Sequence, residues 1–360
     1  MDPAKSAGVQ PWCGFREELA RWLPVEVTAD LDRDLPRARA LVYLTRSEGL
    51  GSGILLAMAR GSSRTVHGNP HGAGEHFRLR TGAEPVIFQV LAGLFGLLIG
   101  SFLNVCIYRW PRGRSVVCPR SACPECGKPI AWYDNIPVLS YLILRARCRQ
   151  CGAGISWRYS VVELVTAVTF AYFAGHYGMS LEAVKYCVLS SILIALVFTD
   201  LETLLLPDEL TLGGCAIGLG FAAFVPVPDM TFHLIASLSG FELSGRTGML
   251  GEALFGAIVP AGSIWLGGWL FEKLRHKQGL GFGDVKMLAM IGAFLGIRGA
   301  LLTIILASVA GSIVGLAYIK LTGKDAATYQ LPFGSFLGAA ALAAAIAGQS
   351  FIAWYARALG

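Results

Sequence analysis

Long apolar runs recur from about residue 86 to the end of the chain, and they constrain the fold more than any other feature. A run near 20 apolar residues can cross the hydrocarbon core of a bilayer as a helix. With only 15% charged residues and a mean hydropathy of +0.56, the chain does not have the composition of a soluble protein. We expect an all-α polytopic membrane protein with about eight transmembrane helices, or seven if the short run 284–297 does not cross. The other runs are 86–107, 160–178, 183–199, 209–225, 249–271, 299–319 and 332–350.

Basic residues gather in the segment 109–158, which carries nine Lys or Arg residues and only two acidic ones. Such loops stay on the cytoplasmic side of a membrane, so we expect a small cytoplasmic loop domain here. Eight helices also place the basic segments 272–283 and 320–331 on the cytoplasmic side. With seven helices, the segment 320–331 would lie on the opposite side of the membrane. Because the charge surplus lies between apolar segments, it favours membrane orientation over nucleic-acid binding.

The first 84 residues differ from the rest, since they hold 21 of the 54 charged residues and match no motif. We expect residues 1–84 to be a partly disordered extension or the product of a mis-assigned translation start. The predicted organisation then continues with a first transmembrane helix at 85–108, the cytoplasmic loop at 109–158 and a membrane-embedded core at 159–352.

Two CxxC pairs lie inside the predicted loop, Cys123 with Cys126 and Cys148 with Cys151. Paired thiolates at this spacing bring four ligands together around a structural zinc ion. Disulfides are the alternative, but the reducing cytoplasm disfavours them. Cys118 is a fifth candidate, and we interpret it as a bystander because four ligands complete a structural site.

Two aspartates stand at the edges of apolar runs, where a charge is expensive and suggests function. Asp200 ends one run, and Asp284 follows Gly281-Phe282-Gly283 at the start of another. The threading places both at the cytoplasmic edge, where two carboxyl groups could divide one proton and hydrolyse an amide. The helix macrodipole should disfavour the charge of Asp200, near a helix C-terminus, and favour that of Asp284, near an N-terminus.

Other acidic residues have simpler interpretations. Asp208 is well placed to be the N-cap of the following helix, and Asp284 alone could also be a cap. Glu163, inside an apolar run, is expected to be a polar packing partner or an interface residue. A zinc-stabilised membrane transporter or adaptor without peptidase activity therefore remains an alternative to an enzyme.

Taken in order, these motifs resemble the type IV prepilin peptidases, which are membrane-embedded aspartic proteases of the GxGD kind. The resemblance covers roughly residues 86–350. Ser335 departs from the family pattern, because a second proline is common at that position after Pro-Phe-Gly. The motifs that carry the resemblance are Gly100-Ser101-Phe102-Leu103-Asn104-Val105 with Arg109 and Pro111, Cys123-Pro124-Glu125-Cys126, Asn135-Ile136-Pro137 with Ser140, Cys148-Arg149-Gln150-Cys151, Asp200 through Leu206-Pro207-Asp208 to Thr211, Gly281-Phe282-Gly283-Asp284-Val285-Lys286, and Pro332-Phe333-Gly334.

The resemblance implies an aspartic endopeptidase of the bacterial inner membrane. It would cleave the basic leader of type IV prepilins or type II secretion pseudopilins after a glycine, at the cytoplasmic face. It would also N-methylate the new N-terminal residue with S-adenosylmethionine, for which no residues are assigned. Its partners would be the pilin precursors and membrane lipid. The site residues implied are the catalytic Asp200 and Asp284, the supporting Gly281, Gly283, Lys286 and Asp208, and the zinc ligands Cys123, Cys126, Cys148 and Cys151.

Overall fold

The computed structural model describes residues 84–227, 229–240, 245–275, 281–322 and 332–359, all within the compact unit Thr81–Gly360. The expected extension 1–84 lies outside the described residues except for Glu84. Within these ranges the fold is all-α, as predicted, and its only β-structure is two isolated bridges. The long helices are α3 (Glu84–Arg109), α5 (Arg158–Tyr177), α6 (Leu181–Thr203), α7 (Asp208–Ala222), α9 (Gly245–Arg275), α10 (Phe282–Thr322) and α11 (Phe333–Leu359).

Among the described residues, four helical segments are long and apolar enough to cross a membrane: Val86–Arg112, Leu181–Thr203, Gly245–Arg275 and Phe282–Tyr318. A shorter apolar segment follows at Phe333–Gly348. The expected runs 160–178 and 209–225 also form helices, α5 and α7. A polytopic helical membrane protein is therefore confirmed, while the count of eight spans stays a prediction.

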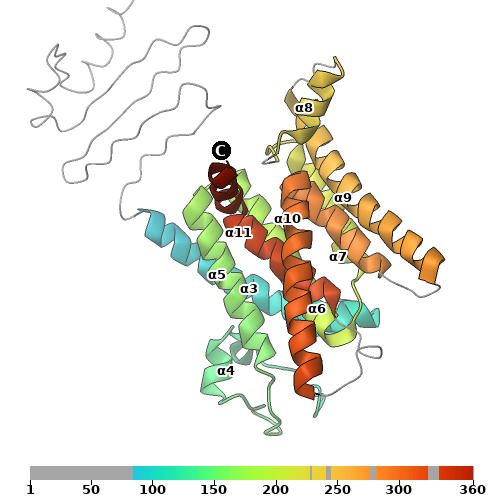
Figure 1. Cartoon of the computed structure of the whole chain (residues 1–360). Coiled ribbons are helices and arrows are strands. Elements are labelled where there is room, and N and C mark those ends of the chain that lie inside the picture. Colours follow the sequence, from blue (N-terminus) through green and yellow to red (C-terminus); the bar gives the residue numbers. More distant parts are fainter. Residues whose placement is uncertain (1–83, 228, 241–244, 276–280, 323–331, 360) are drawn as a thin grey trace, which may run out of the picture. The chain divides into compact units, whose positions relative to one another are not determined.

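The runs 284–297 and 299–319 belong to one continuous element, α10, which is bent at Gly296. This residue has φ 75° and ψ −176°, so two helical segments meet there (Figure 1). A Cβ atom at this position would lie 2.8 Å from Cβ of Asp229, and left-handed φ values favour glycine. The predicted boundary between the two runs thus coincides with a real break in the helix.

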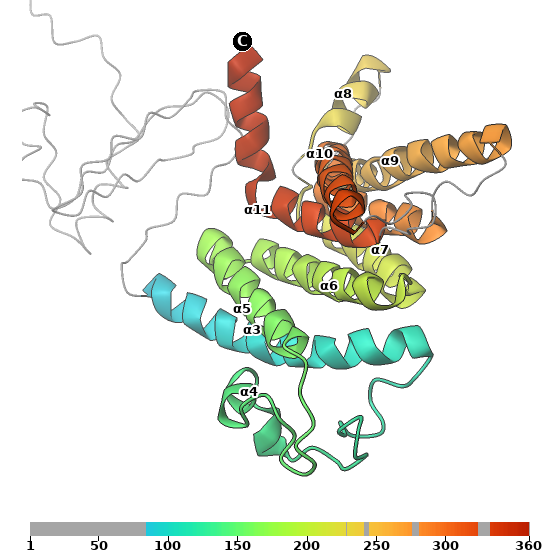
Figure 2. The ribbon, with the colours of Figure 1, turned by 60° about the horizontal axis from the view of Figure 1, so that its bottom comes forward.

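Helix α6 occupies the middle of the bundle and packs against α3, α5, α7 and α11 (Figure 2). Leu189, Leu193 and Leu196 are fully buried in the same hydrophobic cluster as Met287 and Ile291 of α10. The central position of α6 explains why its last turn, which carries Asp200, is surrounded by other elements.

Helices α3 and α5 pack with their backbones in close contact. A Cβ atom at Gly100 would lie 2.6 Å from Cα of Glu163, so no larger residue fits without a shift of one helix. Small residues that let helix backbones approach are a common means of association in lipid. This contact holds α3 and α5 at a fixed distance, and the segment between them starts and ends on these two helices.

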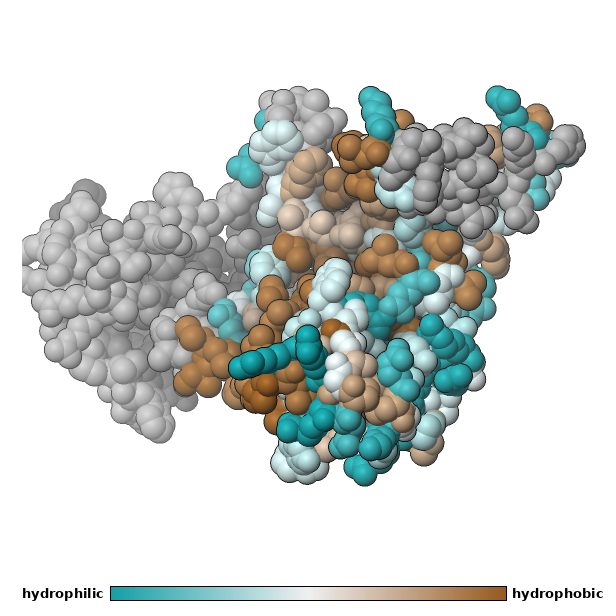
Figure 3. All heavy atoms as spheres, turned by 90° about the horizontal axis from the view of Figure 1, so that it is seen from below, coloured by the Kyte–Doolittle hydropathy of each residue, from teal (hydrophilic) through white to brown (hydrophobic). Residues whose placement is uncertain are grey.

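The segment between α3 and α5 contains only short elements: η2 (Trp110–Arg112), η3 (Trp132–Asn135) and α4 (Leu139–Ile143). It holds the two isolated bridges, Ala122 with Pro129 and Arg147 with Gly154. Seen from below, hydrophilic side chains cover much of this end, beside hydrophobic patches (Figure 3). A polar segment with so little regular structure needs a cross-link to hold its shape.

Candidate active site and metal centre

Asp200 lies in the last turn of α6 and is 5% exposed. Its Oδ2 atom accepts two hydrogen bonds from Ser335, one from the backbone N–H at 2.6 Å and one from Oγ at 2.8 Å. Ser335 is in the first turn of α11, where backbone N–H groups are available to other partners, and its N–H also lies 3.2 Å from the Pro332 carbonyl oxygen. A buried carboxylate is therefore stabilised by donors from a helix far away in the sequence.

This arrangement adds a second helix end to the surroundings predicted for Asp200. The residue is near the C-terminal end of α6, as expected, but its side chain also meets the N-terminal end of α11. A helix N-terminus carries partial positive charge and favours an anion. The prediction considered only the dipole of α6, and the opposing dipole of α11 was not visible from local sequence.

Asp284 lies in the first turn of α10, and its backbone N–H donates to the Gly281 carbonyl at 3.1 Å. Among the described residues, no donor hydrogen-bonds to its carboxylate. A Cβ atom at Gly281 would lie 3.2 Å from Oδ2 of Asp284, so this glycine leaves room beside the carboxyl group. Asp284 is thus a member of the first turn rather than the residue that caps the helix.

The structure brings the surroundings of the two aspartates together. Leu206 packs against Gly283 on one side, since a Cβ atom there would lie 3.2 Å from Cβ of Leu206. It also packs against Gly334, where a Cβ atom would lie 3.0 Å from Leu206 and 3.1 Å from Cγ of Asp200. Side chains 84 positions apart in the sequence therefore share one site.

Asp208 does not cap α7, which corrects the N-cap prediction. The N-cap of α7 is Pro207, and no side chain caps this end. Instead, an Asp208 carboxylate oxygen accepts a 2.6 Å hydrogen bond from Nζ of Lys286 on α10. Asp208 and Lys286 thus join the first turns of α7 and α10, next to Asp284.

The four predicted metal ligands form one cluster. The Sγ atoms of Cys123, Cys126, Cys148 and Cys151 all lie within 4.8 Å of one another. Cys118 is exposed and outside this cluster, as expected for a bystander.

Each CxxC pair sits in a tight turn. Gly127 donates its N–H to the Cys123 carbonyl and Gly152 to that of Cys148, each at 2.9 Å. Both glycines have left-handed φ values, 67° and 72°, which a β-carbon would strain. The two turns aim the thiols of their cysteines at a common point.

The thiols of the cluster have perturbed acidity. Backbone N–H groups of Cys151 and Gln150 lower the pKa of Cys148 to about 7. The N–H of Ala153 acts to lower the pKa of Cys151, but desolvation and the neighbouring thiols, Cys148 first, raise it to about 12. Four thiolates this close repel one another unless a cation lies between them. The donor set and its spacing fit a tetrahedral zinc ion.

One polar contact joins two parts of the cysteine-bearing segment, the chain between α3 and α5, and a second attaches that segment to α5. Asp134 and Arg149 form a bidentate pair with distances of 2.6–3.0 Å, and the hydrogen bond from Arg149 lowers the pKa of Asp134. Buried Glu163 of α5 accepts a 2.7 Å hydrogen bond from the backbone N–H of Val138. Glu163 is therefore a polar packing partner, as expected, and it joins the segment to the helices.

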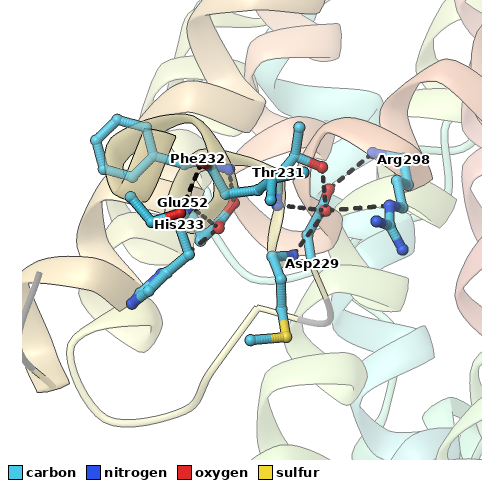
Figure 4. Close-up of polar contacts among 9 residues, drawn as sticks. Asp229, Thr231, Phe232, His233, Glu252 and Arg298 are labelled. Atoms are coloured by element: carbon cyan, nitrogen blue, oxygen red, sulfur yellow. Dashed lines mark hydrogen bonds and ion pairs between the residues drawn. The ribbon is translucent and has the colours of Figure 1, made fainter. Parts of the chain in front are cut away.

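A second polar cluster, which the sequence analysis missed, lies beside α8 (Thr231–Leu238) (Figure 4). The buried carboxylate of Asp229 accepts from the backbone N–H groups of Met230, Thr231 and Arg298, at 2.9–3.2 Å. It also accepts from Oγ1 of Thr231 at 2.6 Å and pairs with Nε of Arg298 at 3.3 Å. One side chain thus caps both α8 and the second segment of α10.

Glu252 of α9 extends this cluster by accepting from the backbone N–H groups of Phe232 and His233, at 3.1 and 2.8 Å. An aspartate just before a helix is a recognisable cap signal, so Asp229 could have been found from the sequence. Glu252 lies inside a helix and gives no such signal. The oxygens of both carboxylates accept hydrogen bonds from groups within the protein, so we interpret the cluster as structural.

Together, the long apolar helices, the four-cysteine cluster and the paired aspartates define a polytopic membrane protein with a four-cysteine segment whose spacing suits a metal ion. Two family models match the chain: the bacterial peptidase A24 N-terminal domain over residues 94–177 and the type IV leader peptidase family over residues 187–316.

Several curated relatives, each called a prepilin leader peptidase/N-methyltransferase, are similar to the chain. The protein from Pseudomonas aeruginosa is 35% identical over 295 residues, which cover 76% of this chain and 92% of the relative. That from Pseudomonas putida is 36% identical, covering 77% and 96%. That from Myxococcus xanthus is 40% identical, covering 66% and 65%. No solved structure matches the chain. The chain belongs to the type IV leader peptidase family, which confirms the resemblance stated above.

Proposed function

We propose that this protein cleaves the basic leader peptide of type IV prepilins or type II secretion pseudopilins after a glycine, using Asp200 and Asp284. The relatives named above and the family model support prepilin cleavage and do not support the transporter or adaptor alternative. The observation that carries the assignment to these residues is their shared site. Asp200 lies in the last turn of α6 and Asp284 in the first turn of α10, and Leu206 packs against both Gly334, next to Asp200, and Gly283, next to Asp284.

Such a pair can hydrolyse a peptide bond when one carboxyl group is ionised and the other carries a proton. The ionised carboxylate takes a proton from water while the water oxygen bonds to the scissile carbonyl carbon, and the neutral carboxyl gives its proton to the carbonyl oxygen. The resulting diol then collapses. The C–N bond breaks as the first carboxyl returns its proton to the leaving nitrogen, and a diol hydroxyl proton restores the second.

The site is proposed to face the cytoplasm. The basic segment between α3 and α5 carries nine Lys or Arg residues, which favours that side of the membrane. The C-terminal end of α3, the N-terminal end of α5 and the C-terminal end of α6 lie together, because Tyr108, Arg158 and Glu202 line one hollow. Asp200 is in the same turn of α6 as Glu202. A short basic leader would therefore meet the carboxylates without crossing the bilayer.

The second proposed activity is N-methylation of the new N-terminal residue, supported by the names of the relatives. S-adenosylmethionine would supply the methyl group to the amine. The hollow has a volume of about 360 Å³. Arg158 and Glu202 pair with each other in it, which leaves Arg112 for a ligand carboxylate and the aromatic rings for a cation or a base. These features fit the cofactor, and we propose this hollow for it. Its lining residues are Tyr108, Arg112, Ser156, Arg158, Tyr159 and Glu202.

The peptidase assignment is tested with purified protein in detergent and a synthetic prepilin. Asp200→Asn and Asp284→Asn should each abolish cleavage, whereas Glu209→Gln, an exposed carboxylate near the same edge, should leave cleavage intact. Turnover at the wild-type rate in a folded Asp284→Asn protein would refute the dyad.

The cofactor site is tested separately by titrating S-adenosylhomocysteine into the protein and measuring heat. Arg112→Ala should weaken binding at least tenfold, and the matched variant Arg114→Ala, which removes an arginine outside the hollow, should not. Equal affinities of the two variants for S-adenosylhomocysteine would show that the cofactor does not bind in this hollow.

A further inference from the structure

Among the described residues, Ser335 is the one that donates hydrogen bonds to the side chain of Asp200. Its backbone N–H and its hydroxyl both point to Oδ2, at 2.6 and 2.8 Å, and Ser335 is itself 6% exposed. Among the described residues, no donor reaches Oδ1 of Asp200. One oxygen is therefore held by the protein, and the other is left for water or for Asp284.

The hydroxyl of Ser335 has a second acceptor within reach, because its Oγ lies 3.1 Å from the carbonyl oxygen of Val197. A hydroxyl has one proton to donate but two lone pairs that can accept. When Asp200 is ionised, Ser335 can donate to it. When Asp200 takes up a proton at Oδ2, the hydroxyl can accept that proton's hydrogen bond and turn its own proton to Val197.

The backbone N–H of Ser335 can only donate, and it lies closer to Oδ2 of Asp200, at 2.6 Å, than to the carbonyl oxygen of Pro332, at 3.2 Å. Together with the N-terminal end of α11, it favours the ionised form of Asp200. Asp284 has no comparable donor among the described residues. The pair is thus asymmetric, and the asymmetry comes from α11.

Other charges near Asp200 are paired. Glu202 on α6 pairs with Arg158 of α5, and Asp208 of α7 pairs with Lys286 of α10. Among the described residues, Asp284 lies near Asp200 without such a partner, because Leu206 packs both against Gly283, next to Asp284, and against Gly334, next to Asp200. Removal of the Ser335 hydroxyl should therefore change the protonation of Asp200 and Asp284 and leave the two ion pairs unchanged.

We propose that Ser335 is a positioning residue that holds Asp200 as the ionised member of the pair and leaves the proton on Asp284. This rests on the proposed peptidase function. It assigns Asp200 as the base toward water and Asp284 as the acid toward the scissile carbonyl. It is a property of this chain, whose Ser335 replaces the proline common at that position, and a proline has no N–H to donate.

The test is the pH dependence of kcat/KM for cleavage of a synthetic prepilin by the full chain in detergent. Ser335→Ala removes the hydroxyl and keeps the backbone N–H. Protonation of Asp200 should then begin at higher pH, so the acid-side midpoint should move up by about half to one pH unit. Rates at alkaline pH should converge with those of the wild type, and KM should change little.

Ser335→Thr keeps a hydroxyl and should restore the wild-type midpoint, whereas Ser335→Gly should behave like Ser335→Ala. An unshifted midpoint in both hydroxyl-free variants, with equal loss of rate at all pH values, would show that Ser335 is only structural and overturn the proposal. Wild-type activity of Asp284→Asn would instead overturn the peptidase dyad itself, so the two failures are distinguishable. Unfolding temperature and zinc content of each variant confirm that the protein compared is folded.

Discussion

The carboxylate of Glu163 accepts a 2.7 Å hydrogen bond from the backbone N–H of Val138, and this contact joins α5 to the cysteine-bearing segment. Val138 has φ 59°, which is unusual for a β-branched residue and holds its N–H toward the helix. A buried carboxylate thus anchors a strained backbone position at the start of α4. The segment is attached to the membrane helices at a defined point and not only through its two ends.

Replacement of Glu163 should loosen this attachment. Glu163→Ala removes the acceptor from a buried N–H and should cost about 1–3 kcal/mol of unfolding free energy. Glu163→Gln keeps an acceptor oxygen and should cost less. Two measurements on the wild type and both variants check this: the rate of limited proteolysis between α3 and α5, and the thermal unfolding of the whole protein. Equal protection in Glu163→Ala and the wild type would show that the contact contributes nothing.

The ion pair between Asp208 and Lys286 should contribute far less to stability. Asp208→Asn removes the charge partner of Lys286 in a pair whose Asp208 side chain is 57% exposed. Exposed pairs contribute about 0–1 kcal/mol, so the variant should fold and keep substantial cleavage activity. The steady-state rate of prepilin cleavage by Asp208→Asn should be compared with the rates of Asp200→Asn and Asp284→Asn. Complete loss of activity in a folded Asp208→Asn protein would add this residue to the catalytic machinery.

The cysteine cluster should hold about one zinc ion per chain. Cys123→Ser should lose the metal and loosen its segment, because ligand binding and folding of small metal sites are coupled. Methyl transfer should fall further than cleavage, since Asp200 and Asp284 lie on other elements. Metal content by mass spectrometry should distinguish Cys123→Ser from the matched variant Cys118→Ser. Equal zinc in both variants would contradict the assignment.

Acid should release the same metal. Backbone N–H groups of Cys151 and Gln150 lower the pKa of Cys148 to about 7, so its thiolate is available at neutral pH. Below that range protons compete with zinc for the thiolates, and the stability that the metal supplies is lost as the pH falls. Release of zinc to a colorimetric chelator between pH 7 and 5 measures this. Metal retained at pH 5 with an unchanged segment would argue for another kind of cross-link.

The Asp229 cluster should be a major source of stability near the bend in α10. Asp229→Ala leaves the N–H groups of Thr231 and Arg298 without their acceptor and should cost about 2–4 kcal/mol. Gly296→Ala should also destabilise, because its Cβ atom would lie 2.8 Å from Cβ of Asp229. Unfolding in detergent checks both, with Gly262→Ala as the control, since no atom lies within 4 Å of a Cβ there. Wild-type stability of Asp229→Ala would show that water replaces the cap.

Local sequence was sufficient for several features. Apolar runs of membrane length predicted the helices, because the bilayer accepts little else. Two CxxC pairs predicted the four-cysteine cluster, since each pair forms a turn of its own. Asp200 and Asp284 stood out because charges at the ends of apolar runs are costly.

The tertiary structure decided how these residues are partnered. Asp208 was expected to cap α7 but pairs with Lys286, 78 positions away. Asp200 was expected to face an unfavourable dipole but meets the first turn of α11, 135 positions away. The caps made by Asp229 and the acceptor role of Glu163 likewise depend on which helices meet. Cap and dipole rules act within about one helical turn, whereas these partners are chosen by the packing of whole helices, which no local pattern encodes.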